Sequence, residues 1–185
     1  AYNSCGSLTQ VDIPAGVELG EGCFFNCDGL QTVNIADGIT QIGASAFYSC
    51  DSLTSVRLPD TLETLPNSTF AYCAGLEEIS LPDSLTSIGN TVFYQCGKLK
   101  KITIPDTVTR LGNSVFAYCS VMESVELPDS ITSMGGSVFD NCISLTSVTL
   151  PSKLTALSNY MFIDCSKLTT VVLPEQLVSI GDWVF

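Results

Sequence analysis

The chain has 185 residues, of which 45% are hydrophobic and only 14% charged, so it can bury a sizeable core and is too apolar for a disordered protein. Nineteen acidic residues against seven basic ones give a net charge of −12, which argues against nucleic acid and anionic membranes as partners, because both require clustered Lys and Arg. No apolar run approaches the length of a membrane span, so we expect no membrane insertion by this segment.

One pattern recurs along the whole chain with a period of 23 residues. Such a period is typical of a solenoid, so we expect a single domain over residues 1–185 with about eight 23-residue repeats. Neither end shows a polar capping repeat, and we therefore expect a fragment of a longer protein. The units begin at Cys5, Cys27, Cys50, Cys73, Cys96, Cys119, Cys142 and Cys165.

Within each unit the first predicted element is a short strand. Residues 53–59 alternate apolar and polar side chains, which is typical of a strand with one buried face, and Pro59 ends it because proline cannot donate to a β-ladder. Two residues then turn the chain. A second extended stretch follows, on which Leu62 and Leu65 point back inside.

The second half of each unit predicts a bend and a short helical turn. A glycine usually follows the second stretch, which suggests a tight bend or a positive φ. An asparagine at the next position, as at Asn67 and Asn90, is typical of a helix N-cap. Phe70 and Cys73 lie three residues apart, as they would on one side of a short α- or 3₁₀-helix.

Stacking of the units predicts the architecture. No unit can bury its apolar face alone, so the copies are expected to form one continuous core and a parallel sheet with about 4.8 Å between strands. We predict an α/β repeat fold, a curved leucine-rich-repeat solenoid, with the sheet on the concave face and the short helical turns on the convex side.

The repeat also resembles a known family. Its segment Leu-x-x-Val-x-Leu is the strand motif of a leucine-rich repeat, and the extension Leu-Pro-x-x-Leu-x-x-Ile-Gly-x-x-x-Phe-x-x-Cys resembles the BspA-like, or Treponema pallidum, type. The resemblance covers all eight copies. It implies a surface or secreted protein that adheres to host matrix proteins, other cells or bacterial partners, and it carries over no binding residue.

The cysteine column, defined by the eight residues that begin the units, has two readings. Neighbouring units place these residues close to the separation that a disulfide requires. The alternative, which we favour, is a column of reduced, buried thiols that pack beside phenylalanine. A linear column without histidine offers no zinc site. Cys23 lies off the column and is the thiol expected to be exposed.

Aspartates form a second column, directly after the proline position of the repeat. A ladder of carboxylates could collect Ca²⁺, but one aspartate per unit is sparse, and aspartate after proline is a common turn residue, so we predict no metal site and no cofactor. Stacked like charges should raise some of these pKa values. The column comprises Asp37, Asp60, Asp83, Asp106 and Asp129.

Two surfaces are candidate binding sites. The predicted concave face is polar and lacks aromatic residues, and its charged rows Glu77–Lys100–Glu123 and Glu78–Lys101 suggest cross-strand pairs that set the strand register. Its candidate ligand-binding residues are Arg57, Glu78, Lys101, Thr103 and Glu126. The second surface is an aromatic strip expected on the convex side, either as a platform for sugars or as packing between units. It comprises Tyr48, Tyr72, Tyr94 and Tyr118.

Catalysis has little support. The chain lacks histidine and any glycine-rich phosphate loop, so we predict no enzyme activity. The favoured function is a non-enzymatic adhesion or recognition module, extracellular or on the cell surface, whose partner is a host or neighbouring-cell protein or glycan. The alternative is a structural spacer that presents another domain and has no ligand of its own.

Overall fold

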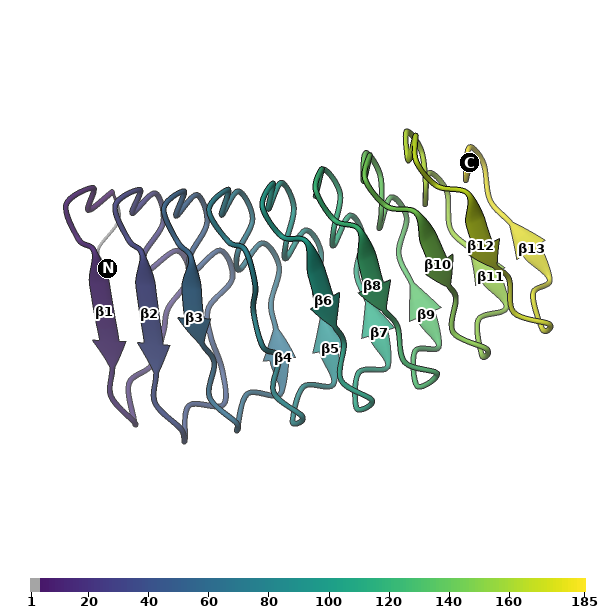
Figure 1. Cartoon of the computed structure of the whole chain (residues 1–185). Helices are drawn as coiled ribbons and strands as arrows, with labels where there is room; N and C mark the ends of the chain where they lie inside the picture. Colours follow the sequence, from purple (N-terminus) through teal and green to yellow (C-terminus); the bar gives the residue numbers. More distant parts are fainter. Residues whose placement is uncertain (1–3) are drawn as a thin grey trace.

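The computed structural model describes residues 4–185 and shows a single row of stacked coils (Figure 1). Each coil runs up one face and down the other, so the row has a front face and a back face, named after their positions in Figure 1. The front strands are β1 (Gln10–Ile13), β2 (Thr32–Ile35), β3 (Ser55–Arg57), β6 (Lys101–Thr103), β8 (Ser124–Glu126), β10 (Ser147–Thr149) and β12 (Thr170–Val172). The back strands are β4 (Thr64–Leu65), β5 (Ser87–Ile88), β7 (Arg110–Leu111), β9 (Ser133–Met134), β11 (Ala156–Leu157) and β13 (Ser179–Ile180).

All strand pairs are parallel and keep the register of the repeat. Val33 pairs with Val56 on the front face, and Leu65 pairs with Ile88 on the back face. The front strands are hydrogen-bonded in three groups, β1-β2-β3, β6-β8 and β10-β12, whereas the back strands β4-β5-β7-β9 form one continuous ladder. The strand that the repeat predicts at residues 78–80 is not formed.

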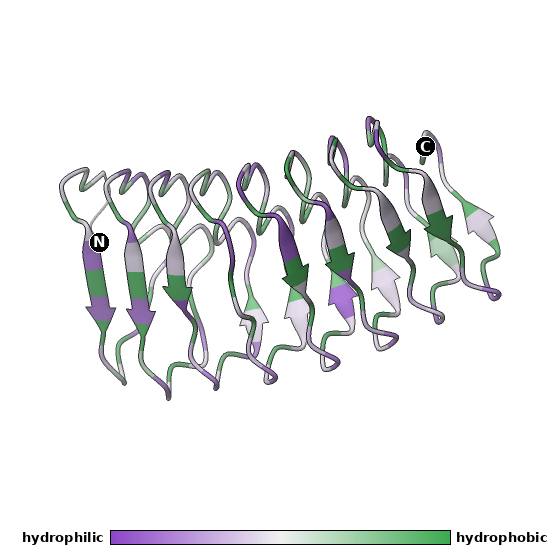
Figure 2. Cartoon of the chain, in the orientation of Figure 1, coloured by the Kyte–Doolittle hydropathy of each residue, from purple (hydrophilic) through white to green (hydrophobic). Residues whose placement is uncertain are grey.

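The core follows the predicted columns. Along the front strands β3, β6, β8 and β10 the central residue is buried and apolar and its neighbours are exposed, and Figure 2 shows the hydrophobic centre of these strands. Phenylalanines of successive coils stack with ring centroids 5.4–5.9 Å apart and nearly parallel planes. This phenylalanine stack runs from Phe24 to Phe185; Tyr2, which precedes it in the repeat, lies outside the described residues.

The prediction of short helical or 3₁₀ turns is wrong, because the described residues 4–185 contain no helix. The segments instead form successive tight turns in which two residues four apart, such as Ser45 and Ser49, have positive φ. A helix would direct its N–H groups beyond the first turn to its own carbonyl groups. Here the amide of Phe47 bonds to Thr69 O of the next coil at 3.0 Å, while that of Tyr48 closes a turn to Ser45 O. These segments, which we call the turn side, therefore hold neighbouring coils together.

The asparagine and glycine columns also join coils. The predicted N-cap role of asparagine is wrong, since Asn67 Oδ1 accepts the backbone N–H of Asn90 at 2.8 Å, and Asn90 Oδ1 accepts that of Asn113. The sequence suggested that the recurring glycine serves either a tight bend or a positive φ. The glycines of this column, such as Gly89 and Gly112, do not have positive φ, so the second reason is wrong. A Cβ at Gly112 would lie 2.5 Å from the backbone carbon of Gly89, so glycine permits the close approach of adjacent coils.

Candidate functional site

A hollow of about 540 Å³ lies on the front face, where the strand at residues 78–80 is missing. Four of the five residues predicted for ligand binding line it. Residues of β3, β6 and β8 complete its walls, including Ser55 and Ser124. We call this hollow the front opening. The predicted residues in its lining are Glu78, Lys101, Thr103 and Glu126.

The charged groups around the front opening are mostly unpaired. Thr103 Oγ1 donates to Glu126 Oε2 at 3.2 Å, but within residues 4–185 no ion pair joins Glu78 to Lys101. An adjoining hollow of about 440 Å³ is lined by the neighbouring row of charges, including Lys100 and Glu123. The cross-strand charge pairs suggested by the sequence are therefore absent, and Glu77 instead lies 3.6 Å from Lys98.

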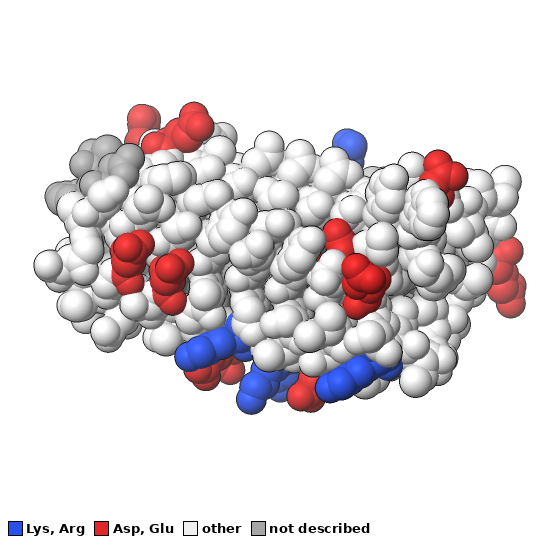
Figure 3. Space-filling model, turned by 90° about the horizontal axis from the view of Figure 1, so that it is seen from above, with Lys and Arg blue, Asp and Glu red and all other residues white. Residues whose placement is uncertain are grey.

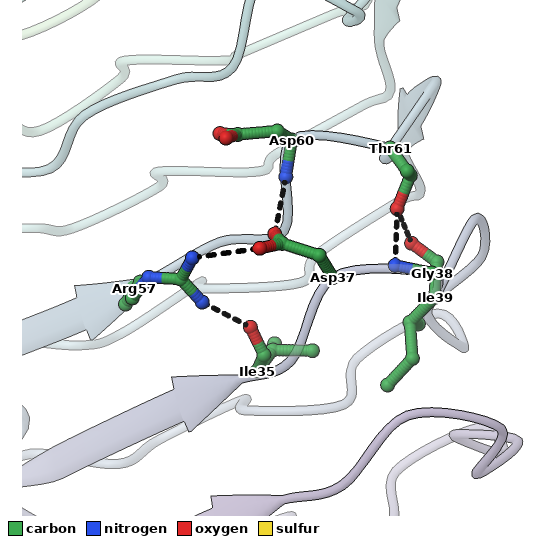
Figure 4. A network of polar contacts seen from close by, with 7 residues as sticks. All are labelled: Ile35, Asp37, Gly38, Ile39, Arg57, Asp60 and Thr61. Carbon is green, nitrogen blue, oxygen red and sulfur yellow. Dashed lines mark hydrogen bonds and ion pairs between the residues drawn. The ribbon is translucent and has the colours of Figure 1, made fainter.

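The fifth predicted residue, Arg57, lies at the far end of β3 and is held by its own network (Figure 4). Its guanidinium donates to Asp37 Oδ2 and to Ile35 O, both at 3.0 Å, while Asp60 N donates to Asp37 Oδ1. Hydrogen bonds from the Asp60 amide and the guanidinium lower the pKa of Asp37. Arg57 borders a smaller hollow of about 370 Å³, so it joins two coils more than it serves the front opening.

Aspartates of the aspartate column accept backbone N–H groups from the turn of the next coil. Asp129 Oδ1 accepts the backbone N–H of Ser152 at 2.8 Å, as Asp37 does for Asp60. The expected rise in pKa is wrong for these two aspartates, because the amide bonds lower the pKa of both carboxyl groups. Within the described residues no group of three or more Cys, Asp or Glu side chains is arranged to hold a metal ion.

The four predicted tyrosines lie together on the turn side and are joined by Phe25, which the sequence reasoning missed. Phe25 stacks on Tyr48 at 4.7 Å with an interplanar angle of 4°. The following pairs are 5.0–5.4 Å apart and tilted by 50–60°. We call these five residues the aromatic strip. Because the rings already contact one another closely, the arrangement favours packing between coils over a platform for sugars.

The far end of the aromatic strip is acidic. The nearby carboxylate of Asp140, followed by burial, raises the pKa of Tyr118, which is 40% exposed. Asn141 Nδ2 donates to Asp140 Oδ1 at 2.8 Å and to Asp164 Oδ2 at 3.4 Å. Seen from the turn side, most basic side chains gather along one long edge of the molecule with acidic ones among them, and further acidic side chains are spread over the rest of this face (Figure 3).

None of the nine cysteines forms a disulfide, and most of the cysteine column is fully buried. Each thiol from Cys50 onward donates to the carbonyl of the phenylalanine 26 residues earlier; Cys96 Sγ, for example, lies 3.2 Å from Phe70 O. Burial raises the pKa of Cys50 and Cys119 to about 12. Protonated, enclosed thiols are poor nucleophiles, so the cysteine column has a packing role in the hydrophobic core rather than a chemical one. Cys23 is only partly buried.

The back face carries a hollow of about 520 Å³ that the sequence did not predict. It runs across β4, β5, β7 and β9 over the glycine and asparagine columns, and Arg110 is its one charged lining residue. The glycines leave the space, because no side chain projects from Gly89 or Gly112. The recurrence of glycine beside asparagine is the signal that could have indicated it.

Comparison with known proteins places these observations in a family. The whole chain matches the family described as "BspA type Leucine rich repeat region (6 copies)", over residues 1–123 and 86–185. A leucine-rich repeat protein from Bacteroides ovatus has a similar structure, with 33% identity and a TM-score of 0.91 over 95% of this chain and 48% of that one. No curated protein matches the sequence.

Two further solved structures are similar. The leucine-rich repeat protein of T. pallidum shares 32% identity with a TM-score of 0.75 over 95% of this chain and 74% of that one. A leucine rich cell surface protein from Faecalibacterium prausnitzii shares the fold, at 24% identity and a TM-score of 0.66 over 93% and 65% of the two chains. The present chain spans about half the length of the B. ovatus protein.

Proposed function

Because the chain belongs to the BspA-type leucine-rich repeat family, we propose that it is a non-enzymatic recognition module that binds a protein or glycan through its front face. The proposed setting is the cell surface or the extracellular space, and the proposed partner belongs to a host or a neighbouring cell. Within residues 4–185 no helix is long and apolar enough to cross a membrane.

The observation that carries this proposal is the front opening. Glu78 and Lys101 are exposed there without an ion-pair partner, and Thr103 and Glu126 stand beside them on neighbouring strands. Charged groups that are not paired within the chain can bind a partner without first losing an internal contact. The paired strands β6 and β8 hold the main chain of Lys101, Thr103 and Glu126 in place, which lowers the entropy cost of binding.

The experiment is a binding assay of the chain against immobilised matrix proteins, mucins and glycans. The double change Lys100→Glu and Lys101→Glu reverses the positive charge beside the front opening, while Arg110→Glu makes the same kind of change on the back face. We expect saturable binding whose affinity the front change alters by at least about tenfold and the back change leaves intact. Equal effects of the two changes would refute a front-face site.

A structural spacer is the second candidate, and the phenylalanine stack favours it. Rings from Phe24 to Phe185 are in contact without a gap, and the turn side adds hydrogen bonds between coils along the same length. Such a row is suited to hold another domain at a distance. Absence of binding to every component of the panel would support this function over recognition.

A further inference from the structure

The main chain of residues 78–81 is the one front segment among the described coils that is not a strand. Its amide and carbonyl groups make no hydrogen bond, whereas Lys101–Thr103 pair with β8 and Ser55–Arg57 pair with β2. The side chains of Ile79 and Leu81 are also partly exposed, while Ile102 and Ile104, at the same positions of the next coil, are 3% exposed. Residues 78–81 therefore form the floor of the front opening with free polar groups and accessible apolar side chains.

The remainder of this coil is firmly held. Its back strand β5 pairs with β4 on one side and with β7 on the other. Its Phe93 stacks between Phe70 and Phe116, and the amide of Asn90 bonds to Asn67 Oδ1. The missing strand is thus a local interruption of the front face inside a fixed frame, and the opening does not depend on a loosened coil.

Unpaired backbone amides and carbonyls have a preferred partner chemistry. An extended peptide presents alternating N–H and C=O groups at about 3.3 Å per residue and can therefore satisfy several neighbouring groups at once. The unpaired amide and carbonyl groups of four consecutive residues offer donors and acceptors to such a peptide. No aromatic side chain lines the front opening, so the stacking that commonly accompanies sugar binding is absent from its lining.

The charges around the opening specify the peptide further. The two adjoining hollows are lined by four carboxylates and two ammonium groups, of which, within residues 4–185, only Glu77 is ion-paired, with Lys98 outside the lining, and the chain as a whole carries a net charge of −12. A partner with basic side chains is therefore attracted both over a distance and at contact. The acidic groups are Glu77, Glu78, Glu123 and Glu126, and the basic groups are Lys100 and Lys101.

We propose that the front opening binds an extended peptide segment of a partner protein, rich in Lys or Arg, whose main chain pairs with residues 78–81. This inference rests on the proposed recognition function and specifies its ligand class. Binding completes the strand that the repeat lacks at this coil. The carboxylates of Glu78 and Glu126 contact the basic side chains, and Ile79 and Leu81 take up apolar ones.

The first test is residue-resolved amide hydrogen exchange of the free chain. Amides of residues 79–81 are expected to exchange rapidly, whereas those of Ile102 and Thr103 in the next coil are expected to be protected. Protection of both segments in the free chain would overturn the proposal, because the ladder would then be closed.

The second test adds a capped peptide of alternating lysine and valine. We expect saturable binding, slower exchange at residues 79–81, and binding about tenfold weaker for the glutamate–valine peptide. A lysine–valine peptide that is N-methylated at alternate amides, and so lacks part of its main-chain donors, should also bind about tenfold more weakly. The double variant Glu78→Gln and Glu126→Gln is expected to weaken binding, and Glu63→Gln on the back side serves as the matched control.

The outcomes separate this inference from the function on which it rests. Equal binding of the methylated and unmethylated peptides would overturn main-chain pairing. Binding of an oligosaccharide at residues 79–81, with no effect of the peptide, would leave front-face recognition standing and overturn the peptide ligand. Absence of both the peptide effect and any panel binding that depends on Lys100 and Lys101 would contradict both proposals.

Discussion

Replacement of Cys96 by alanine tests why cysteine recurs in every coil. Its side chain is fully buried beside the phenylalanine stack, and its thiol donates to Phe70 O at 3.2 Å. The same carbonyl otherwise accepts only the amide of Cys73, also at 3.2 Å. Alanine would remove the buried sulfur and one of the two donors to this carbonyl at once.

The expected cost is the sum of these two losses. Removal of a buried heavy atom and the small cavity it leaves costs about 1 kcal/mol or more, and the weakened satisfaction of a buried carbonyl adds about 0.5–1.5 kcal/mol. We therefore expect Cys96→Ala to lower the free energy of unfolding by about 1.5–3 kcal/mol. Urea-induced unfolding followed by circular dichroism measures this change.

Two comparisons make the result interpretable. Cys119→Ala removes the same contact one coil further on, to Phe93 O at 3.2 Å, and should cost a similar amount. Cys23→Ala removes a partly buried thiol outside the column and should cost less than about 0.5 kcal/mol. If Cys96→Ala were as mild as Cys23→Ala, the column would tolerate any small residue and the thiol–carbonyl contact would not stabilise the core.

Four further predictions concern the same frame. Gly112→Ala should cost about 1–3 kcal/mol because its Cβ meets backbone of the previous coil, whereas Gly97→Ala, with open space around it, should be neutral in the same urea assay. Burial raises the pKa of Cys50 and Cys119 to about 12, so the unfolded chain ionises first, and stability should fall as the pH rises above the ordinary value of 9.0. The pKa of Asp37 is lowered in the folded chain, so ionised Asp37 stabilises the fold above the ordinary pKa of 3.8, and this stabilisation is lost as the pH falls through the folded pKa. Asp37→Asn should therefore reduce the dependence of the free energy of unfolding on pH in the acid range. Thiol titration of the denatured, unreduced chain should find nine thiols, and a titration that finds a single thiol would contradict a column without disulfides.

The sequence predicts the coils because their determinants are periodic. Apolar residues at fixed positions, such as Val56 and Ile102, can be buried only if the strands stack in register, and proline then ends each strand. The phenylalanine and cysteine columns follow for the same reason. Both strand sets and the continuous core are therefore confirmed, except for the front strand at residues 78–80, and the second stretch has Leu65 inside as predicted.

The turn side could not be predicted from the same spacing. Phenylalanine and cysteine three residues apart fit a short helix and a series of tight turns equally well. The difference lies in residues with positive φ, and these include Ser45, Tyr72 and Gln95, residue types that carry no clear preference for that conformation. The energetic reason is collective, because the turns free backbone groups to bond to the next coil.

The front opening has no signal in its own sequence either. Residues 76–82 read Leu-Glu-Glu-Ile-Ser-Leu-Pro and keep the apolar pattern of the coils that do form a strand. The charges at Glu78 and Lys101 suggested pairing across strands, but no ion pair joins them in the structure, where Glu78 lies within the interruption and Lys101 on the neighbouring strand β6. By contrast, Phe25 could have been found, since it lies one period before Tyr48.

The central claim is that the chain recognises a partner through its front face. It is tested most directly by mapping the amide chemical-shift changes of the isotope-labelled chain when the matrix protein, mucin or glycan that binds is added. A front-face recognition module predicts changes confined to residues 54–56, 78–81, 101–103, 124 and 126, which line the front opening. Changes centred on the back strands β5 and β7, or on the aromatic strip from Phe25 to Tyr118, would contradict it.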